Sequence, residues 1–484
     1  MTRGWLRALL VAVVSAGLLT PAAHAREPAD PGIPPPPPPA AAELPSVAAS
    51  QELSDLLEEL QGFRQVRPRG DVAVAVGDAA GNPLAATNAT TPMLPASTMK
   101  LVTAAAALRV LGPDHRFVTR VRTTAAPDGD GVVDGDLVLV GGGDPVLATP
   151  LFARRVNSAR PATTLRLLAR RVARAGITRV TGDVVGDPSI LADEPLAGGW
   201  TDRYLAGLDT SRSSGLTVDA GVRLFRRSGT LRAEAARDPA VRAARQFTDL
   251  LSDSGVTVAG THGRRREAGA PGMEVARISS PPLHELLTHM LQTSDNHLAD
   301  GIFRMLGATT GDPTWDGSAA AARRALDDAG IDWDGLRLAD GSGLSRHNRL
   351  TADAIVRLLH TMANDPLRRP WLRMQARAGA SGTMRRRLAG GPAEGRVVAK
   401  TGTLRDVRSL AGTVPGRDGR DHHFAVLAND LTAARDVAAA RRLADVVALA
   451  LVVAQDGCGP PVPVSDQTDA RPPEAVICGT MRPE

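Results

Sequence analysis

Hydrophobic and polar residues alternate along several short segments of this chain, and elsewhere they form longer apolar runs. Residues 71–76 alternate Val with small residues, and a turn rich in Gly and Asn separates them from 84–87, which predicts a β-hairpin. Residues 97–111 are rich in Ala, Leu and Val with little polarity, which predicts a helix buried on nearly all sides. The folded part therefore begins with two strands and a central helix.

Three apolar segments toward the C-terminal end are joined by Gly/Asp turns, and they predict an antiparallel meander that a final helix follows. Between hairpin and meander, 117–258 combines short Val/Leu strands with Arg-rich helices, which indicates a β-rich insertion. We therefore predict an α+β fold, an antiparallel sheet with helices, carrying a large insertion. The meander segments are 396–400, 407–414 and 424–429, and the predicted helices are 164–175, 282–291, 352–362 and 433–453.

The first residues have the pattern of a secretory signal peptide. Arg3 and Arg7 precede an apolar run over 8–19, and Ala23-His24-Ala25 fits a small-x-small cleavage site. The run is too short for a membrane-spanning helix. We predict a signal peptide over 1–25 and a mature chain without a transmembrane anchor, secreted to the cell wall or periplasm.

Two further segments lie outside the predicted core. Six consecutive prolines within 26–50 predict an extended Pro/Ala-rich linker, with a ligand for a proline-reading domain as the alternative. Cys458 and Cys478 are the only cysteines, and in an exported protein such a pair indicates a disulfide. We predict that it staples a C-terminal tail over 458–484.

Charge and composition exclude some classes of function. The 57 basic and 52 acidic residues are scattered along the chain, and aromatic residues make up 3%, so a nucleic-acid surface built on base stacking is not expected. Lysine occurs only at Lys100 and Lys400, and every other basic residue is arginine. A lysine amine can lose its proton and act as a base, which arginine cannot do. Biased codon usage is the alternative explanation.

Both lysines fall within short polar motifs. Ser97 and Lys100 are three positions apart at the start of the buried helix, which places a hydroxyl beside an amine on one helix face. Ser294-Asp295-Asn296 follows a predicted helix, and Lys400-Thr401-Gly402 lies where the first meander strand is expected to end. Each motif taken singly also has a purely structural explanation. Ser97 could cap a helix, Ser294-Asp295-Asn296 could be a polar loop, and Lys400-Thr401-Gly402 could lead from a strand into a turn.

Other chemistries lack their motifs. Neither lysine follows a glycine, so a phosphate-binding loop is not expected. His284 and His289 are five residues apart, which does not suit a metalloprotease helix, and a Gly-x-Ser-x-Gly elbow is missing. We predict no metal and no cofactor.

The three motifs, in this order, are the signature of penicillin-binding proteins and class A β-lactamases. Ser97 and Ser294 are 197 positions apart, too far for a compact β-lactamase. The chain therefore resembles the low-molecular-mass class C penicillin-binding proteins, the D-alanyl-D-alanine carboxypeptidase/endopeptidase family, over about 53–451. Similar stretches are Pro95-Ala96-Ser97, Gly141-Gly142-Gly143-Asp144-Pro145, Leu216-Thr217-Val218-Asp219, Asp340-Gly341-Ser342-Gly343-Leu344-Ser345-Arg346 and Ala428-Asn429.

The resemblance implies a penicillin-binding transpeptidase/β-lactamase-like domain in two pieces, 51–116 and 265–457, interrupted by one or more inserted domains over 117–264. It also implies that Ser97 attacks the carbonyl of the penultimate D-alanine of a peptidoglycan stem peptide. Lys100, kept neutral by burial and by the field of Lys400, would accept the hydroxyl proton.

The remaining motif residues receive roles from the same resemblance. Ser294 would pass a proton to the departing amine, and Asn296 would hold the substrate amide and orient Lys100. Lys400 and Thr401 would hold the terminal carboxylate, while Gly402 allows close approach of the ligand backbone. The amides of Ser97 and Thr403 would form the oxyanion hole.

Asp144 and Arg346 are implied to bind the side chain of the stem peptide's diamino acid, an acid for the ammonium and a base for the carboxylate. The alternative is that Asp144 caps a turn and Arg346 is solvated.

The sequence thus predicts a serine DD-peptidase whose partners are peptidoglycan stem peptides, with β-lactams as covalent inhibitors and no nucleic acid. A β-lactamase is one alternative, disfavoured by the large insertion and by the lack of a deacylating Glu motif. A non-catalytic wall-binding or penicillin-sensing protein is the other.

Overall fold

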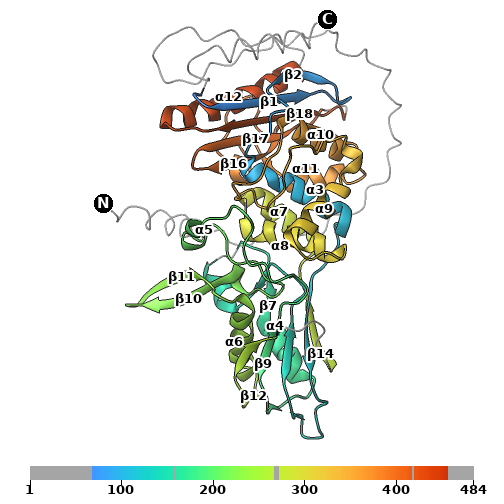
Figure 1. Ribbon diagram of the computed structural model, residues 1–484, viewed down its shortest axis with the longest axis vertical. Coiled ribbons are helices and arrows are strands. Elements are labelled where there is room, and N and C mark those ends of the chain that lie inside the picture. Colours follow the sequence, from blue (N-terminus) through green and yellow to red (C-terminus); the bar gives the residue numbers. More distant parts are fainter. Residues whose placement is uncertain (1–67, 157–158, 266–271, 417–418, 456–484) are drawn as a thin grey trace, which may run out of the picture.

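The computed structural model describes residues 68–156, 159–265, 272–416 and 419–455. The predicted signal peptide, the Pro/Ala-rich linker and the Cys458–Cys478 pair lie outside the described residues. Figure 1 shows two parts along the long axis: a sheet covered by helices at one end, and a part formed by the middle of the chain at the other.

The first part is built on a six-stranded sheet with the order β15-β16-β17-β18-β1-β2, in which every neighbouring pair is antiparallel. The strands from both ends of the described chain meet here, because β1 lies between β2 and β18. The hairpin and the meander are therefore confirmed. The strands are β1 (Asp71–Gly77), β2 (Pro83–Thr87), β15 (Ala376–Arg377), β16 (Val398–Leu404), β17 (Val407–Val414) and β18 (His422–Asn429).

Strand β16 runs to Leu404, so Lys400-Thr401-Gly402 lies inside the strand, and the prediction that it ends the strand is wrong. The pairing of Lys400 with Ala411 and of Leu404 with Val407 continues the ladder to a short turn. The motif is therefore held in a rigid strand instead of a loop.

Both faces of the sheet are buried, and alternate residues enter two cores. Val74 and Val426 pack under α12 (Ala434–Gln455), whereas Ala75 and Leu427 join the core of the helices on the opposite face. This period of two is the reason that the strand prediction succeeded. The helices of the second face are α3 (Met99–Leu111), α7 (Leu283–Thr293), α8 (Asn296–Thr309), α9 (Trp315–Arg324), α10 (Ala352–Ala363) and α11 (Arg368–Met374).

Helix α3 is the centre of this helical layer. Every residue from Met99 to Leu108 is buried, and α7, α8, α9 and α10 all contact the helix. Its alanines allow these neighbours to approach closely on all sides. The predicted all-round burial of this helix is confirmed.

The middle of the chain forms the second part, with a core of its own. Its main sheet has the order β13-β9-β5-β3-β14, and α4 (Leu165–Arg174) and α6 (Pro239–Ser252) pack beside it. The sheet strands are β3 (Val118–Thr123), β5 (Leu137–Val140), β9 (Val184–Asp187), β13 (His262–Arg264) and β14 (Met273–Ser279). The smaller elements are β4 (Val132–Val133), β6 (Leu147–Ala148), β7 (Thr163–Thr164), β8 (Arg179–Val180), α5 (Asp202–Ala206), β10 (Val222–Arg227), β11 (Thr230–Ala235) and β12 (Thr257–Val258).

The boundary of this inserted part differs from the sequence prediction. β14 pairs antiparallel with β3, the strand on which the insertion begins, so the inserted part closes at Ser279 and not at residue 264. The chain leaves and re-enters the helical layer through two adjacent strands, which is why α3 and α7 remain neighbours.

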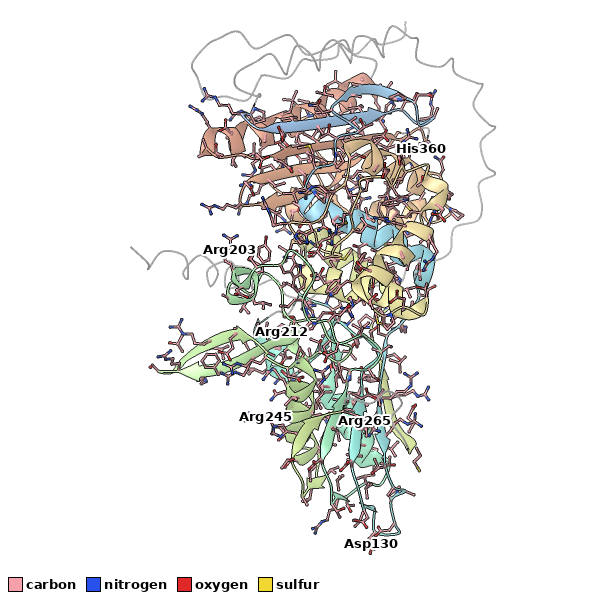
Figure 2. The ribbon with its side chains drawn as sticks, viewed as in Figure 1. Asp130, Arg203, Arg212, Arg245, Arg265 and His360 are labelled. Atoms are coloured by element: carbon pink, nitrogen blue, oxygen red, sulfur yellow. The ribbon has the colours of Figure 1, made fainter. Side chains whose placement is uncertain are left out.

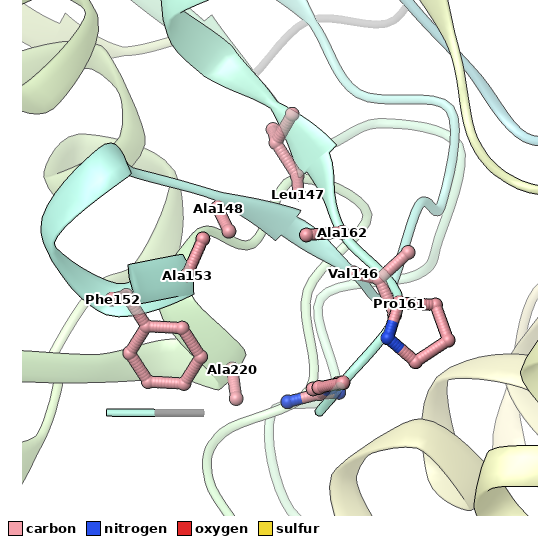
Figure 3. A pocket seen from close by; sticks show the side chains of 9 residues that line it. Val146, Leu147, Ala148, Phe152, Ala153, Pro161, Ala162 and Ala220 are labelled. Atoms are coloured by element: carbon pink, nitrogen blue, oxygen red, sulfur yellow. The ribbon is translucent and has the colours of Figure 1, made fainter. Parts of the chain in front are cut away.

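The inserted part also contains a small pocket, mostly apolar, around Phe152 and Val146 (Figure 3). None of the predicted site residues lines it. In the described residues, no helix has the length and apolarity needed to cross a membrane.

Candidate active site

Ser97 lies in a one-turn 3-10 helix, Ala96–Thr98, that leads directly into α3. Ala96 has a φ of +48°, a left-handed conformation that is costly for a residue with a Cβ. Two glycines make room for this turn. A Cβ on Gly343 would lie 1.8 Å from the Ala96 carbonyl oxygen, and one on Gly402 would lie 2.9 Å from the Pro95 carbonyl oxygen and 3.1 Å from Ala96 Cβ. The turn before Ser97 is thus clamped between the loop of Gly343 and strand β16.

Lys100 faces Ser97 one helical turn later. Its Nζ lies 3.0 Å from Ser97 Oγ, 2.7 Å from Asn296 Oδ1 and 2.6 Å from the carbonyl oxygen of Ser342. A neutral amine has two N–H donors and one lone pair. If the donors go to Asn296 and Ser342, the lone pair faces the Ser97 hydroxyl, which is the arrangement that a general base requires.

Burial lowers the pKa of the Lys100 amine to about 8, although the carboxylates of Asp300 and Asp340 act in the opposite direction. Lys400 is also fully buried, and burial followed by the charge of Lys100 holds its pKa well below the usual value. The sequence interpretation named burial and the field of Lys400 as the causes, and burial is the larger effect on Lys100 in the structure.

Ser294 ends α7 in the left-handed conformation, with φ at +64°, and Asp295 begins α8 by accepting a hydrogen bond from the Leu298 amide. Burial opposes ionisation of Asp295, but Arg160 of the inserted part lies 3.3 Å away and holds the pKa of its carboxyl below the usual range. Asn296 donates to the Asp209 carbonyl at 2.8 Å while its oxygen faces Lys100. Asp295 therefore stabilises the start of α8, whereas Ser294 and Asn296 face the cleft.

Two buried carboxylates shape the loop behind Lys100. Asp300 accepts hydrogen bonds from the amides of Gly341 and Ser342, and Asp340 accepts from those of Gly343 and Ser345. Burial and the neighbouring Asp340 raise the pKa of Asp300 well above its usual value. These bonds fix the Ser342 carbonyl against Lys100. The sequence interpretation missed Asp300, although it lies one helical turn after Asn296.

An open cleft of about 550 Å³ lies in front of Ser97. The structure brings five of the predicted residues to this cleft, namely Ser97, Ser294, Asn296, Thr401 and Thr403. Lys100 and Lys400 are fully buried and do not line it, and the Lys400 amine donates to the Thr401 carbonyl at 2.9 Å. Gly402 lines an adjoining cavity.

Other cleft residues were not predicted. Arg203, Tyr204 and Asp209 come from α5 and the loop after it, so the inserted part forms one wall; Arg203 is labelled in Figure 2. Arg405 and Arg408 come from the β16–β17 turn and from β17. The cleft residues of the inserted part lie far from the three motifs in the sequence, so nothing in the sequence indicates that they line the cleft. Arg405 and Arg408 follow Lys400-Thr401-Gly402 closely, so their position could have been expected.

Asp144 and Arg346 do not line this cleft. Asp144 is buried in the inserted part, where it accepts from the Val146 amide at 2.9 Å, and burial raises its pKa to about 6. Arg346 makes a two-pronged ion pair with Asp406, at 2.7 and 2.9 Å. The structure therefore does not bring this pair together with Ser97, and their predicted role in binding the diamino acid remains a prediction. In the described ranges, no group of three or more His, Cys, Asp and Glu side chains is placed to hold a metal ion.

The sequence of this chain matches a known protein family. The sequence pattern of the D-Ala-D-Ala carboxypeptidase 3 (S13) family matches residues 64–228 and 225–450. The chain belongs to this family. The S13 match includes all three motifs and the inserted part, and it confirms the resemblance to class C penicillin-binding proteins and the predicted enzyme class, a serine-type D-Ala-D-Ala carboxypeptidase.

Curated relatives match most of the chain. A D-alanyl-D-alanine carboxypeptidase of Actinomadura sp. (strain R39) is 32% identical over 450 residues, covering 77% of this chain and 80% of the relative. Carboxypeptidase DacB of Mycolicibacterium smegmatis is 33% identical over 375 residues, covering 76% of each. The crystal structure of penicillin binding protein 4 from Haemophilus influenzae has a TM-score of 0.69 at 23% identity, covering 80% of this chain and 98% of that one. This likeness confirms the predicted α+β penicillin-binding fold.

Proposed function

We propose that this S13 chain hydrolyses the D-Ala-D-Ala bond of peptidoglycan stem peptides through an acyl-enzyme on Ser97, and that β-lactams acylate the same hydroxyl. The observation that carries the proposal is the contact between Ser97 Oγ and Lys100 Nζ at 3.0 Å, with Asn296 and Ser342 fixing the other two directions of the amine. A hydroxyl paired with a buried amine is an activated nucleophile.

In the acylation step, Lys100 accepts the Ser97 proton as Oγ bonds to the carbonyl carbon of the penultimate D-alanine. The C–N bond then breaks, and Ser294, which lines the cleft, passes its proton to the departing amine and regains one from Lys100, so that the amine of Lys100 is neutral again. The backbone amides of Ser97 and Thr403 stabilise the oxyanion, an effect of about 3 kcal/mol per donor.

Water then attacks the ester carbonyl while Lys100 accepts one of its protons, and Lys100 returns that proton to Ser97 Oγ as the ester bond breaks, which restores the hydroxyl. Asn296 holds the amide of the acyl chain, and Thr401 meets the terminal carboxylate before the D-alanine departs. Because Lys400 is buried behind Thr401, its contribution is to fix the strand through the Thr401 carbonyl as well as to supply charge.

The place of action follows from the proposed substrate. We infer that residues 1–25 export the chain and that it works in the cell wall or periplasm, on cross-linked peptides as well as on free pentapeptides. The crystal structure of the Haemophilus influenzae protein in complex with a novel β-lactam is consistent with the proposed inhibition.

The test is incubation with a labelled β-lactam followed by intact-mass analysis, with Ser97→Ala as the control. A long-lived adduct that the control lacks, together with release of D-alanine from a pentapeptide, supports the peptidase. Rapid turnover of the β-lactam favours a β-lactamase, and no adduct leaves a non-catalytic binding protein.

A further inference from the structure

We propose that Arg408 and Arg441 form an anion-binding subsite for a carboxylate carried by the departing segment of the substrate, beyond the carboxylate that meets Thr401. This inference rests on the function proposed above and adds a specificity determinant to it.

The subsite is a groove of about 280 Å³ beside the catalytic cleft. Its walls come from β16, β17, the segment that contains Arg387, and the first half of α12, which carries Arg441. The groove and the cleft share Thr401, Thr403 and Arg408 as lining residues, so the two spaces adjoin at the strand that holds the terminal carboxylate.

Two of the three arginines that line the groove, Arg408 and Arg441, have no carboxylate within 4 Å among the described residues. Arg408 donates from Nη1 to the carbonyls of Leu404 and Val407, at 2.6 and 2.7 Å, and no carboxylate among the described residues lies within 4 Å of it. The nearby Arg441 has no carboxylate at that distance in the described ranges either. Burial and then the charge of Arg441 lower the pKa of Arg408, although the carboxylate of Asp406 acts in the opposite direction, so the two guanidinium groups lie close enough to repel each other.

Several other partly or fully enclosed arginines of this chain are paired with a carboxylate. Arg160, Arg242 and Arg368 each lie within 4 Å of an aspartate. Within the groove itself, Arg387 is neutralised by Asp445 at 2.6 Å. Two repelling cations on one groove cost free energy in the empty enzyme, and a bound anion removes that cost. Among the arginines that line the groove, Arg408 and Arg441 are therefore the two that a bound anion can pair with.

The position of the groove defines which part of the substrate it meets. In the proposed mechanism the acyl part stays on Ser97, and the terminal carboxylate lies at Thr401 on the departing side. The groove begins at Thr401 and leads away toward α12. Lys400 is buried behind Thr401, whereas Arg408 lines the cleft and so adds a positive charge on the surface that faces that carboxylate. If the departing segment carries a second carboxylate, that carboxylate can therefore bind to Arg408 and Arg441 in the groove.

The experiment compares two synthetic peptides with the same acyl part. One releases D-glutamate and the other releases D-glutamine, so that the leaving residues differ in charge and hardly in shape. The readout is the ratio of kcat/KM for the two peptides, with active sites titrated by a β-lactam. We expect the full-length enzyme to prefer the D-glutamate peptide.

In Arg408→Gln and in Arg441→Gln we expect this ratio to fall by about three- to fivefold, the scale of a partly exposed charge pair, and to fall also with rising salt in the unmutated enzyme. Arg373→Gln, on the exposed face of α11, is the matched control and should leave the ratio unchanged. Arg441 is exposed on a helix, so its substitution leaves folding intact.

Turnover of both peptides with a ratio near one, or an equal ratio in the enzyme and both variants, overturns the subsite and leaves the proposed function standing. Turnover of neither peptide, without an adduct on Ser97, overturns both.

Discussion

The amine of Lys100 donates a hydrogen bond of 2.6 Å to the carbonyl of Ser342, a residue that lies 242 positions further along the chain. This bond and the one to Asn296 leave the third direction of the amine for Ser97. A guanidinium in its place keeps the positive charge but has no lone pair.

Lys100→Arg should therefore abolish acylation of Ser97, with a loss of about a thousandfold or more in rate, the scale of a lost general base. The measurement is adduct formation with a labelled β-lactam, and the thermal unfolding midpoint shows whether the variant is folded. Acylation of a folded Lys100→Arg enzyme at a comparable rate would contradict the neutral-base role.

The acylation rate should depend on pH through Lys100, whose pKa is about 8. The neutral amine is the active form, so the rate rises with pH, by about tenfold from pH 6 to pH 7, and levels off above pH 8. Second-order rates of β-lactam acylation between pH 6 and 9 give this profile. A rate that falls over this range would exclude Lys100 as the base.

Gly343→Ala tests the clamp on the nucleophile turn. Gly343 has a φ of +83°, and an added Cβ would meet the Ala96 carbonyl oxygen. We expect a destabilisation of about 3 kcal/mol or more, together with slower acylation.

Gly391→Ala is the control for this change, because nothing lies within 4 Å of a Cβ there and the backbone is not left-handed. It should shift the free energy of unfolding by less than about 0.5 kcal/mol. Equal effects of the two substitutions on stability and acylation would contradict the proposal that close packing of Gly343 against Ala96 holds the turn before Ser97.

Asp144→Asn separates a structural role of Asp144 from a binding role. Its pKa in the folded protein is about 6, above the ordinary value of 3.8, because the carboxyl is buried. The folded state therefore binds the proton more tightly, and this group contributes stability that is lost as pH rises from about 4 to 6. Above pH 6 the loss amounts to about 3 kcal/mol.

We expect Asp144→Asn to be more stable than the unmutated protein at pH 7 and to lose this advantage near pH 4, measured by chemical denaturation. An unchanged KM for a stem peptide would assign Asp144 to structure. A large increase in KM would support the predicted contact with the diamino acid.

The spacing of a few residues made much of the site predictable. Ser97 and Lys100 meet because three positions on a helix place two side chains on one face. Ser294 and Asn296 flank a helix-to-helix corner, where one left-handed residue turns both toward the cleft. Asp300 follows from the same helical period and was within reach of the sequence.

Other features depend on tertiary packing and leave little local signal. Tyr204 and Asp209 reach the cleft because the inserted part folds back toward α8, and Arg408 does so because β17 pairs with β16. β14 was missed as the closing strand of the inserted part, since its partner β3 lies more than a hundred residues earlier in the chain.

The central position of β1 between β2 and β18 has a consequence for how activity arises during synthesis. The ribosome synthesises Ser97 and α3 long before it synthesises Asn296, β16 or β18, the strand that pairs with β1 from the C-terminal end of the chain. A nascent chain that ends early thus contains Ser97 and Lys100, but it lacks the residues that orient the Lys100 amine and the strand that binds the carboxylate. The finished product alone assembles a working centre, so incomplete chains cannot attack peptides.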